Sequence, residues 1–169
     1  MDYRNHVGGI INCNAQAEIV NGGEKIVVLG AGESGVGTAI LAQQKGFRVF
    51  VSDKGKIKEE YKKVLLHNEI DWEEGSHTLS KIMDADEVVK SPGIPDTIQL
   101  IIDLKEKGVS VVSEIEFAAR YTGAKLICIT GSNGKTTTAL MTYHIMSNAG
   151  FNVAVAGNIG ESFAKLVAE

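Results

Sequence analysis

Short apolar runs rich in β-branched residues alternate with longer stretches in which apolar and charged residues recur at helical spacing. The strand-like runs are 25–30, 47–53, 69–72, 86–91 and 109–114. The helical stretches between them are 34–46, 57–68, 77–83 and 97–108. Such alternation is typical of buried parallel strands joined by crossover helices. We therefore predict an α/β fold with a Rossmann-like parallel-sheet domain at 25–115.

The same alternation begins again after Glu114. It predicts helices at 114–123, 135–150 and 161–169, with strands at 125–131 and 152–157. A sheet of so few strands cannot bury both of its faces. Residues 116–169 therefore look like the truncated start of a P-loop α/β ATPase domain, and we expect the chain to be the front part of a longer protein. Residues 1–24 show no clear period, and we interpret them as a loosely ordered arm with one short strand at 9–11.

Composition narrows the class of protein. The chain of 169 residues is 44% hydrophobic and 22% charged, which indicates a globular protein. With a net charge of −4 and no long basic run, it is not expected to bind nucleic acid. No stretch predicts membrane insertion or a signal peptide. Cys13 and Cys128 do not make a disulfide framework, Cys128 is expected to be buried in its strand, and a reducing, cytoplasmic setting fits.

The first of two glycine-rich turns, "LGAGESGVG", joins a predicted strand to a predicted helix. Gly30 permits a tight turn, Gly32 lets a diphosphate approach the backbone, and Gly35 lets helix and strand pack closely. The helix N-terminus and the Ser34 hydroxyl offer hydrogen bonds to phosphate. Asp53 ends the second strand, where an acid usually meets the ribose or base of a nucleotide. NAD and a UDP-sugar both fit; the alternative is a ligand-free turn with Asp53 capping the next helix.

The second turn, "TGSNGKTTT", also lies between a predicted strand and a predicted helix. Gly131 and Gly134 let backbone N–H groups converge on phosphate oxygens, and Lys135 brings a cation to the β- and γ-phosphates. The hydroxyl of Thr136 stands where a P-loop donates a ligand to Mg²⁺. A general P-loop has a further glycine where this chain has Ile129. The alternative is a helix that begins with a lysine and binds no ligand.

The departure at Ile129 points to a particular family. "ITGSNGKTTT" resembles the ATP loop of the Mur ligase family and its folylpolyglutamate synthetase relatives, which read T-G-[ST]-x-G-K-[ST]-[ST]. "GAGESG" with Asp53 after it, "SPGIP" at 91–95 and "GNIG" at 157–160 follow the family's order. This combination resembles the D-glutamate-adding branch, because the folate enzymes lack such a first domain. The alanine-adding branch usually has a longer glycine run and no "SPGI". The resemblance runs from about Lys25 to Glu169.

The resemblance implies an ATP-dependent amide ligase of peptidoglycan precursor synthesis. ATP would phosphorylate the carboxylate of UDP-N-acetylmuramoyl-L-alanine (UDP-MurNAc-L-Ala), and the amine of D-glutamate would attack the acyl phosphate. The implied cofactors are ATP and Mg²⁺, with Thr136 as a metal ligand and Lys135 and Asn158 as catalytic residues. The implied ATP-binding residues are Gly131, Ser132, Asn133, Gly134, Lys135, Thr136 and Thr137. The implied UDP-substrate residues are Gly30, Gly32, Glu33, Ser34, Gly35, Asp53, Lys54, Ser91, Pro92 and Gly93.

Several points stay open at this stage. Ser91–Gly93 can equally be a simple turn that ends a strand. The family's acidic metal ligand, its carbamylated lysine and its D-glutamate domain are not found, so we expect no complete reaction from these residues alone. Competing interpretations are a stand-alone nucleotide-binding or regulatory module, another Mur-type ligase, and an NAD-linked oxidoreductase, which has no use for the second turn. The histidines lack metal-ligand spacing, although His77 can line a channel, and Trp72 and Phe117 are predicted core residues.

Overall fold

The computed structural model describes residues 23–157 and 159–169. The predicted strand at 9–11, nearly all of the predicted arm at 1–24, and Asn158 lie outside the described residues.

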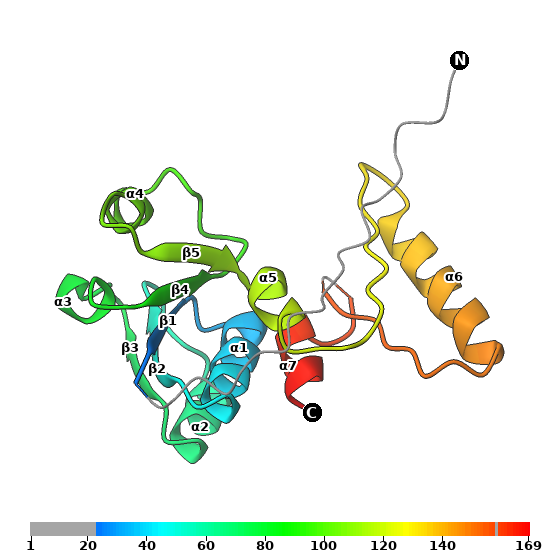
Figure 1. The fold of residues 1–169 in the computed structure, drawn as a ribbon, viewed down its shortest axis with the longest axis horizontal. Helices are drawn as coiled ribbons and strands as arrows, with labels where there is room; N and C mark the ends of the chain where they lie inside the picture. The colour runs from blue at the N-terminus through cyan, green and yellow to red at the C-terminus, as the bar shows by residue number, and fades with distance from the viewer. Residues whose placement is uncertain (1–22, 158) are drawn as a thin grey trace.

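Five parallel strands form one sheet in the order β3-β2-β1-β4-β5 (Figure 1). The strands are β1 (Lys25–Leu29), β2 (Arg48–Asp53), β3 (Asp71–Glu74), β4 (Glu87–Lys90) and β5 (Ser110–Ser113). Val27 of the central strand β1 pairs with Phe50 of β2 and Val88 of β4. The chain changes direction of travel across the sheet between β1 and β4, which is the point where doubly wound folds bind their ligands. The predicted Rossmann-like sheet is confirmed.

Helices cover both faces of this sheet (Figure 1). One face is covered by α1 (Glu33–Gln44), α2 (Glu59–His67) and α5 (Glu114–Ala119). The other face is covered by α3 (Leu79–Ile82) and α4 (Gln99–Glu106). Because side chains alternate along a strand, Ile26 and Val28 pack toward α1 whereas Val27 and Leu29 pack toward α4. None of these four side chains is more than 1% exposed, which explains the uniformly apolar run.

The edge strand β3 differs from its prediction. The pattern placed a strand at 69–72, but Glu69 and Ile70 close the end of α2 through bonds from their N–H groups to the carbonyls of Leu66 and Leu65. Their backbones are therefore unavailable for pairing, and the strand begins at Asp71. Trp72, predicted to be core, is only partly buried on this edge strand, whereas Phe117 of α5 is fully buried as predicted.

The predicted strands of the second unit do not form. Residues 125–131 pair with no other strand in the described part of the chain, and 152–157 contribute only an isolated bridge between Ala156 and Glu161. A strand is stabilised by hydrogen bonds from a neighbour, and an apolar run without a neighbour stays irregular. The prediction that Cys128 is buried is wrong for the same reason, because its side chain is exposed.

Of the three helices predicted from residue 114 onward, the first forms as α5 and packs against the first sheet, and the other two form in different surroundings (Figure 1). α6 (Lys135–Asn148) has no buried residue, and its apolar side chains Leu140, Met141 and Ile145 are 49–62% exposed. α7 (Phe163–Ala168) instead packs against α1 and α5 of the first unit, and its Ala164 is fully buried. After a long, mostly exposed segment, the chain thus packs again against the helices that cover the first sheet.

Candidate functional site

The first glycine turn is built into the carboxyl edge of the sheet. The N–H of Gly30 donates to the Ser52 carbonyl at 2.9 Å, so the turn continues the pairing of β1 with β2. Gly30 has a φ of +95°, and a Cβ there would lie 2.9 Å from Cβ of Ser91. The turn therefore presses directly against the loop after β4, and only glycine fits at this contact.

The other two glycines of the turn have different neighbours. A Cβ on Gly35 would overlap the Gly30 carbonyl, with 2.9 Å to its carbon, so the first turn of α1 packs onto the end of β1. A Cβ on Gly32 would meet nothing within 4 Å, and Gly32 is the N-cap of α1 without a side-chain hydrogen bond. The turn thus has one side packed and one side open, with helix N–H groups at the open side.

Asp53 joins the loops that follow β1 and β2. Its Oδ2 accepts a hydrogen bond from the N–H of Ala31 at 2.7 Å, and its Oδ1 accepts one from the N–H of Gly55 at 2.7 Å. The alternative that Asp53 caps the next helix is wrong, because Lys58 occupies the N-cap of α2. Lys54 follows Asp53 with an exposed side chain, so the edge presents an acid and a base side by side.

The loop after β4 forms the opposite wall of the turn. The N–H of Ser91 donates to the Leu29 carbonyl at 2.9 Å, and the N–H of Ile94 donates back to the Ser91 carbonyl at 3.0 Å. Pro92 and Gly93 are exposed at the tip of this turn. Residues 91–93 thus form a turn that ends β4, and its position places Ser91 beside Gly30 at the sheet's switch point.

His77 adds a polar cluster that was not among the predicted site residues. Its Nδ1 lies 2.8 Å from Oγ of the fully buried Ser52, whose hydroxyl donates to Oε1 of Glu73 at 2.7 Å. A carboxylate only accepts, so the Ser52 proton points to Glu73 and the imidazole carries its proton on Nδ1. The second nitrogen, Nε2, is then an acceptor when the ring is neutral.

Burial favours a neutral His77 ring, whereas hydrogen bonds and a nearby lysine favour an ionised Glu73 beside it. Burial lowers the pKa of His77, although the carboxylates of Asp53 and Glu73 act in the opposite direction. Burial also opposes ionisation of Glu73, yet hydrogen bonds from Thr78 and Ser52 and the charge of Lys81 keep the pKa of Glu73 below its usual value. The sequence offered one signal for this cluster, a histidine in a loop after a strand.

The carboxylate of Glu33 contacts the segment just before α7. Its Oε1 accepts a hydrogen bond from the N–H of Ser162, just before α7, at 3.2 Å. The backbone of Glu33 nevertheless lies in the first turn of α1. The backbone carbonyl of Ser34 also has a partner, because it accepts a hydrogen bond from the Thr38 hydroxyl at 2.8 Å.

The second glycine turn has the conformation of a loop that leads into a helix, but it is exposed. Gly131 and Gly134 have φ values of +151° and +76°, and Gly134 is the N-cap of α6 without a side-chain hydrogen bond. Nζ of Lys135 donates back to the Gly131 carbonyl at 2.6 Å and to the Ser132 carbonyl at 3.4 Å. The ammonium group therefore lies over the loop, and every side chain from Ser132 to Thr138 is exposed.

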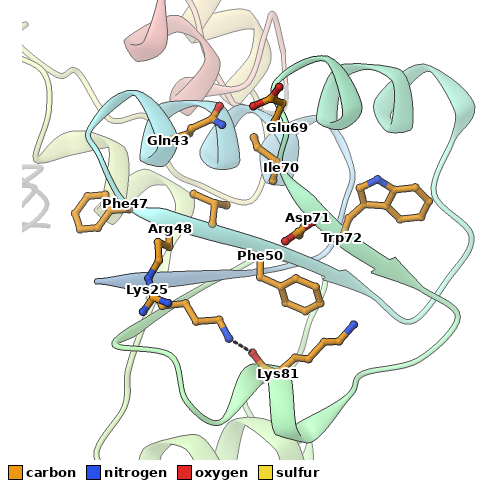
Figure 2. A pocket seen from close by; sticks show the side chains of 11 residues that line it. Lys25, Gln43, Phe47, Arg48, Phe50, Glu69, Ile70, Asp71, Trp72 and Lys81 are labelled. Carbon is orange, nitrogen blue, oxygen red and sulfur yellow. Dashed lines mark hydrogen bonds between the residues drawn. The ribbon is translucent and has the colours of Figure 1, made fainter. Parts of the chain in front are cut away.

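A hollow of 620 Å³ lies at the other edge of the sheet (Figure 2). It is lined by residues at the amino ends of β1, β2 and β3, among them Lys25, Arg48 and Trp72. Lys25 is bound to Asp84 and the Lys81 carbonyl, and Arg48 is bound to the Gly23 carbonyl. Because doubly wound sheets bind ligands at their carboxyl ends, and these cations already have partners, we do not assign the nucleotide to this hollow.

The described residues contain neither a cluster of metal-ligating side chains nor a helix able to span a membrane. Residues 23–157 and 159–169 contain no group of three or more His, Cys, Asp or Glu side chains arranged to hold a metal ion. Across the same ranges, no helix combines the length and apolar character that a membrane span requires.

Comparison with protein families matches both glycine turns. The MurD N-terminal domain model matches residues 25–99, and the Mur ligase middle domain model matches residues 129–166. The UDP-N-acetylmuramoylalanine–D-glutamate ligase of Christiangramia forsetii is 60% identical over 147 residues, covering 87% of this chain and 33% of the relative. The ligase of the same name from Bacteroides fragilis is 62% identical over 146 residues, covering 86% of this chain and 33% of the relative. The chain thus spans about a third of the length of the curated relatives it matches.

Solved structures agree with these matches. A murein peptide ligase from Psychrobacter arcticus superposes with a TM-score of 0.56 at 26% identity, covering 76% of this chain and 27% of that one. A pseudomurein peptide ligase type C from Methanothermus fervidus superposes with a TM-score of 0.53 at 26% identity, covering 79% of this chain and 29% of that one. With two domain matches in the expected order and relatives near 60% identity, the chain belongs to the Mur ligase family and is similar to the N-terminal third of its D-glutamate ligases.

Proposed function

We propose that this chain supplies the UDP-substrate-binding domain, residues 25–115, and the start of the ATP-binding domain, residues 116–169, of a D-glutamate-adding ligase. The observation that carries the proposal is the convergence of Gly30, Asp53 and Ser91 at the carboxyl edge of the sheet. Such an edge, next to the switch point, is where doubly wound folds bind nucleotides. The names of the relatives that match this chain supply the substrate class.

In this proposal the UDP group lies along the open side of the first turn. The N–H groups at the start of α1, from Gly32 to Gly35, bind the diphosphate, since they point out of an uncapped helix N-terminus. Asp53 and Lys54 meet the ribose and base, and Ser91, Pro92 and Gly93 form the wall along which the sugar extends. Asp53 has an additional role, because its bonds to Ala31 and Gly55 keep the two loops at a fixed separation.

The second turn is proposed to hold ATP and Mg²⁺. The residues present fit this role, because a long helix begins there without a side-chain cap and the loop has the positive φ angles that let N–H groups converge. The loop from Gly131 to Thr137 surrounds the phosphates, Lys135 offsets their charge, and the Thr136 hydroxyl is a ligand for Mg²⁺. ATP supplies the phosphoryl group that activates the substrate carboxylate.

The reaction that follows is an amide synthesis. The carboxylate of UDP-MurNAc-L-Ala accepts the phosphoryl group, the amine of D-glutamate attacks the resulting acyl phosphate, and an amide, ADP and phosphate are released. The positive charge of Lys135 stabilises the negative charge on the phosphoryl group as it is transferred. Asn158, the asparagine of the "GNIG" sequence, is proposed to approach the substrate and the phosphate. The proposed setting is peptidoglycan precursor synthesis in the cytoplasm.

Calorimetric titration of the chain with UDP, UDP-MurNAc-L-Ala and NAD tests the first half of the proposal. We expect both UDP compounds to bind more tightly than NAD, because the site sets an acid beside a diphosphate turn and the relatives act on a UDP-linked substrate. Tighter binding of NAD than of either UDP compound would contradict the proposal and favour a dinucleotide-binding module.

A further inference from the structure

Helix α7 is fitted closely onto the first unit (Figure 1). It crosses α1 at Gly37, where an added Cβ would lie 2.9 Å from the backbone nitrogen of Lys165 and 3.1 Å from its Cβ. Ser162 and Ala164 at this contact are only 3% and 0% exposed. A glycine inside a helix lowers helix stability, so its presence at the crossing allows an approach that any side chain would prevent.

Two carboxylates of the first unit bind the N-terminus of α7. Oε1 of Glu114 accepts a hydrogen bond from the N–H of Ala164 at 2.9 Å, and Oε1 of Glu33 accepts one from the N–H of Ser162 at 3.2 Å. Ser162 itself caps the helix by accepting from the N–H of Lys165 at 3.1 Å. Glu114 is only 6% exposed, so its carboxyl group is buried, and the hydrogen bond from Ala164 offsets part of the cost of burial.

The loop that contains "GNIG" is attached directly to this docked helix. Ala156 and Glu161 form a bridge across it, and the N–H of Gly157 donates to the Glu161 carbonyl at 3.2 Å. Gly160 has a φ of +77°, and a Cβ there would lie 3.2 Å from the carbonyl carbon of Val155. The described residues on the two sides of Asn158 are therefore held together immediately before the N-terminus of α7.

We propose that Glu33 and Glu114 are positioning residues that couple the first glycine turn to the Gly157–Gly160 loop through α7. Glu33 follows Gly32 in the turn, so a diphosphate on the N–H groups at the start of α1 orders the residue whose carboxylate contacts Ser162. Glu114 anchors the other side of the same helix N-terminus. Nucleotide binding and docking of α7 therefore stabilise each other. The proposal rests on the proposed function for the identity of the nucleotide, and its docking contacts are independent of that identity.

Hydrogen exchange of the 169-residue chain, with and without saturating UDP, tests the coupling. In the unmodified chain, we expect UDP to slow exchange of the α7 amides about fivefold or more. Glu114→Ala and Gly37→Ala should speed exchange in α7 and weaken UDP binding by a similar factor, since coupling is reciprocal. Glu114→Gln should restore most of the protection, because its side-chain oxygen can still accept from Ala164. Glu116→Ala, an exposed acid on the same helix, is the matched control and should behave like the unmodified chain.

The outcomes separate this inference from the proposed function. Failure of the unmodified chain to bind UDP would overturn the nucleotide site and the coupling with it. Normal UDP binding with no change in α7 exchange would overturn the coupling alone. Equal loss of protection across α1, β1 and α7 in Glu114→Ala, without rescue by Glu114→Gln, would reduce Glu114 to a general stabilising residue and would also overturn the proposal.

Discussion

The two glycine turns of this chain have similar sequences around them and very different surroundings in the structure. Gly30 and Gly35 contact the backbone of the sheet and its loops so closely that a methyl group would overlap a neighbour. A methyl group on Gly134 would meet nothing within 4 Å, one on Gly131 would meet only the Asn133 carbonyl oxygen at an ordinary 3.8 Å, and the helix that follows has no buried residue. A phosphate-binding turn thus needs two things, a loop that can converge its N–H groups and a sheet that fixes the loop. The first turn has both, and the second has the loop.

The largest difference is expected from adding one methyl group to each turn. Gly35→Ala should lower the free energy of unfolding of the sheet domain by about 3 kcal/mol, because the new Cβ overlaps the Gly30 carbonyl at a contact between two backbones that cannot yield easily. Gly134→Ala should leave the main urea transition unchanged, since α6 has no buried residue. Urea unfolding followed by circular dichroism measures both. Similar losses for the two variants would mean that the second turn is packed as tightly as the first.

Substitution of Lys135 in the second turn should affect catalysis strongly and stability hardly at all. In a complete ligase that contains this segment, Lys135→Ala should lower kcat about a hundredfold or more, because it removes a charge that stabilises phosphoryl transfer. Its effect on urea unfolding should be negligible, since the side chain is exposed and bonds only to carbonyls of its own loop. Steady-state kinetics with UDP-MurNAc-L-Ala, D-glutamate and ATP measure the first quantity.

Two neighbouring threonines refine this test. Thr136→Ala should raise the Mg²⁺ concentration needed for activity, since it removes one proposed metal ligand. Thr138→Ala is the control and should be mild, because its exposed side chain is assigned to neither phosphate nor metal. Near-normal kcat for Lys135→Ala would mean that "GSNGKTTT" begins a helix without binding ATP.

The contrast between the turns also shows what a sequence can predict. The sheet of the first unit followed from its apolar runs, because the runs that form β1, β2 and β4 are buried on both faces and every run finds a neighbouring strand within the described residues. The equally apolar run at 125–131 did not form a strand, since apolar character indicates burial but does not provide the neighbour that pairing requires. Cys128 was misplaced with it.

Contacts between distant segments were beyond the reach of a local pattern. The family resemblance implies that Glu33 lies at the nucleotide, and in the structure its carboxylate contacts Ser162, although nothing near either residue in the sequence indicates the other. Asp53 was correctly predicted at the carboxyl edge of the sheet, but its bonds to Ala31 and Gly55 depend on how two loops fold toward each other. Backbone positions of the site were therefore predictable, whereas the partners of its side chains were not.

Substitution of Asp53, beside the packed first turn, should have an intermediate effect on UDP binding. Asp53→Ala should weaken UDP binding by about 1–3 kcal/mol, because the Ala31 and Gly55 N–H groups lose their acceptor and the loops lose their fixed separation. Asp53→Asn keeps one acceptor oxygen, so its UDP affinity should lie between that of the unmodified chain and that of Asp53→Ala. Asp71→Ala is the matched control, since this exposed acid begins β3 at the opposite edge of the sheet. Calorimetry that gives equal losses for Asp53→Ala and Asp71→Ala would contradict a local role for Asp53.

The smallest expected effect is a pH dependence that belongs only to the packed edge. Burial lowers the pKa of His77 in the folded chain, so the unfolded chain binds a proton more readily in the range between the two pKa values. The stability from the neutral ring is present above the ordinary histidine pKa of about 6.5 and declines as the pH falls from there toward the lower folded value.

Urea midpoints measured between about pH 7.5 and 5 should show this decline in the unmodified chain and a flatter profile in His77→Asn. Asparagine keeps a donor near the position of Nδ1 for the Ser52 hydroxyl but does not titrate, so the variant removes the proton and preserves the bond. Because the ring is only partly buried, the slope should be a fraction of the full one-proton value of about 1.4 kcal/mol per pH unit. His144→Asn is the control and should leave the profile unchanged, since His144 is exposed on α6, a helix with no buried residue. An unaltered slope in His77→Asn would show that the carboxylates around Ser52, rather than the imidazole, set the pH response of this edge.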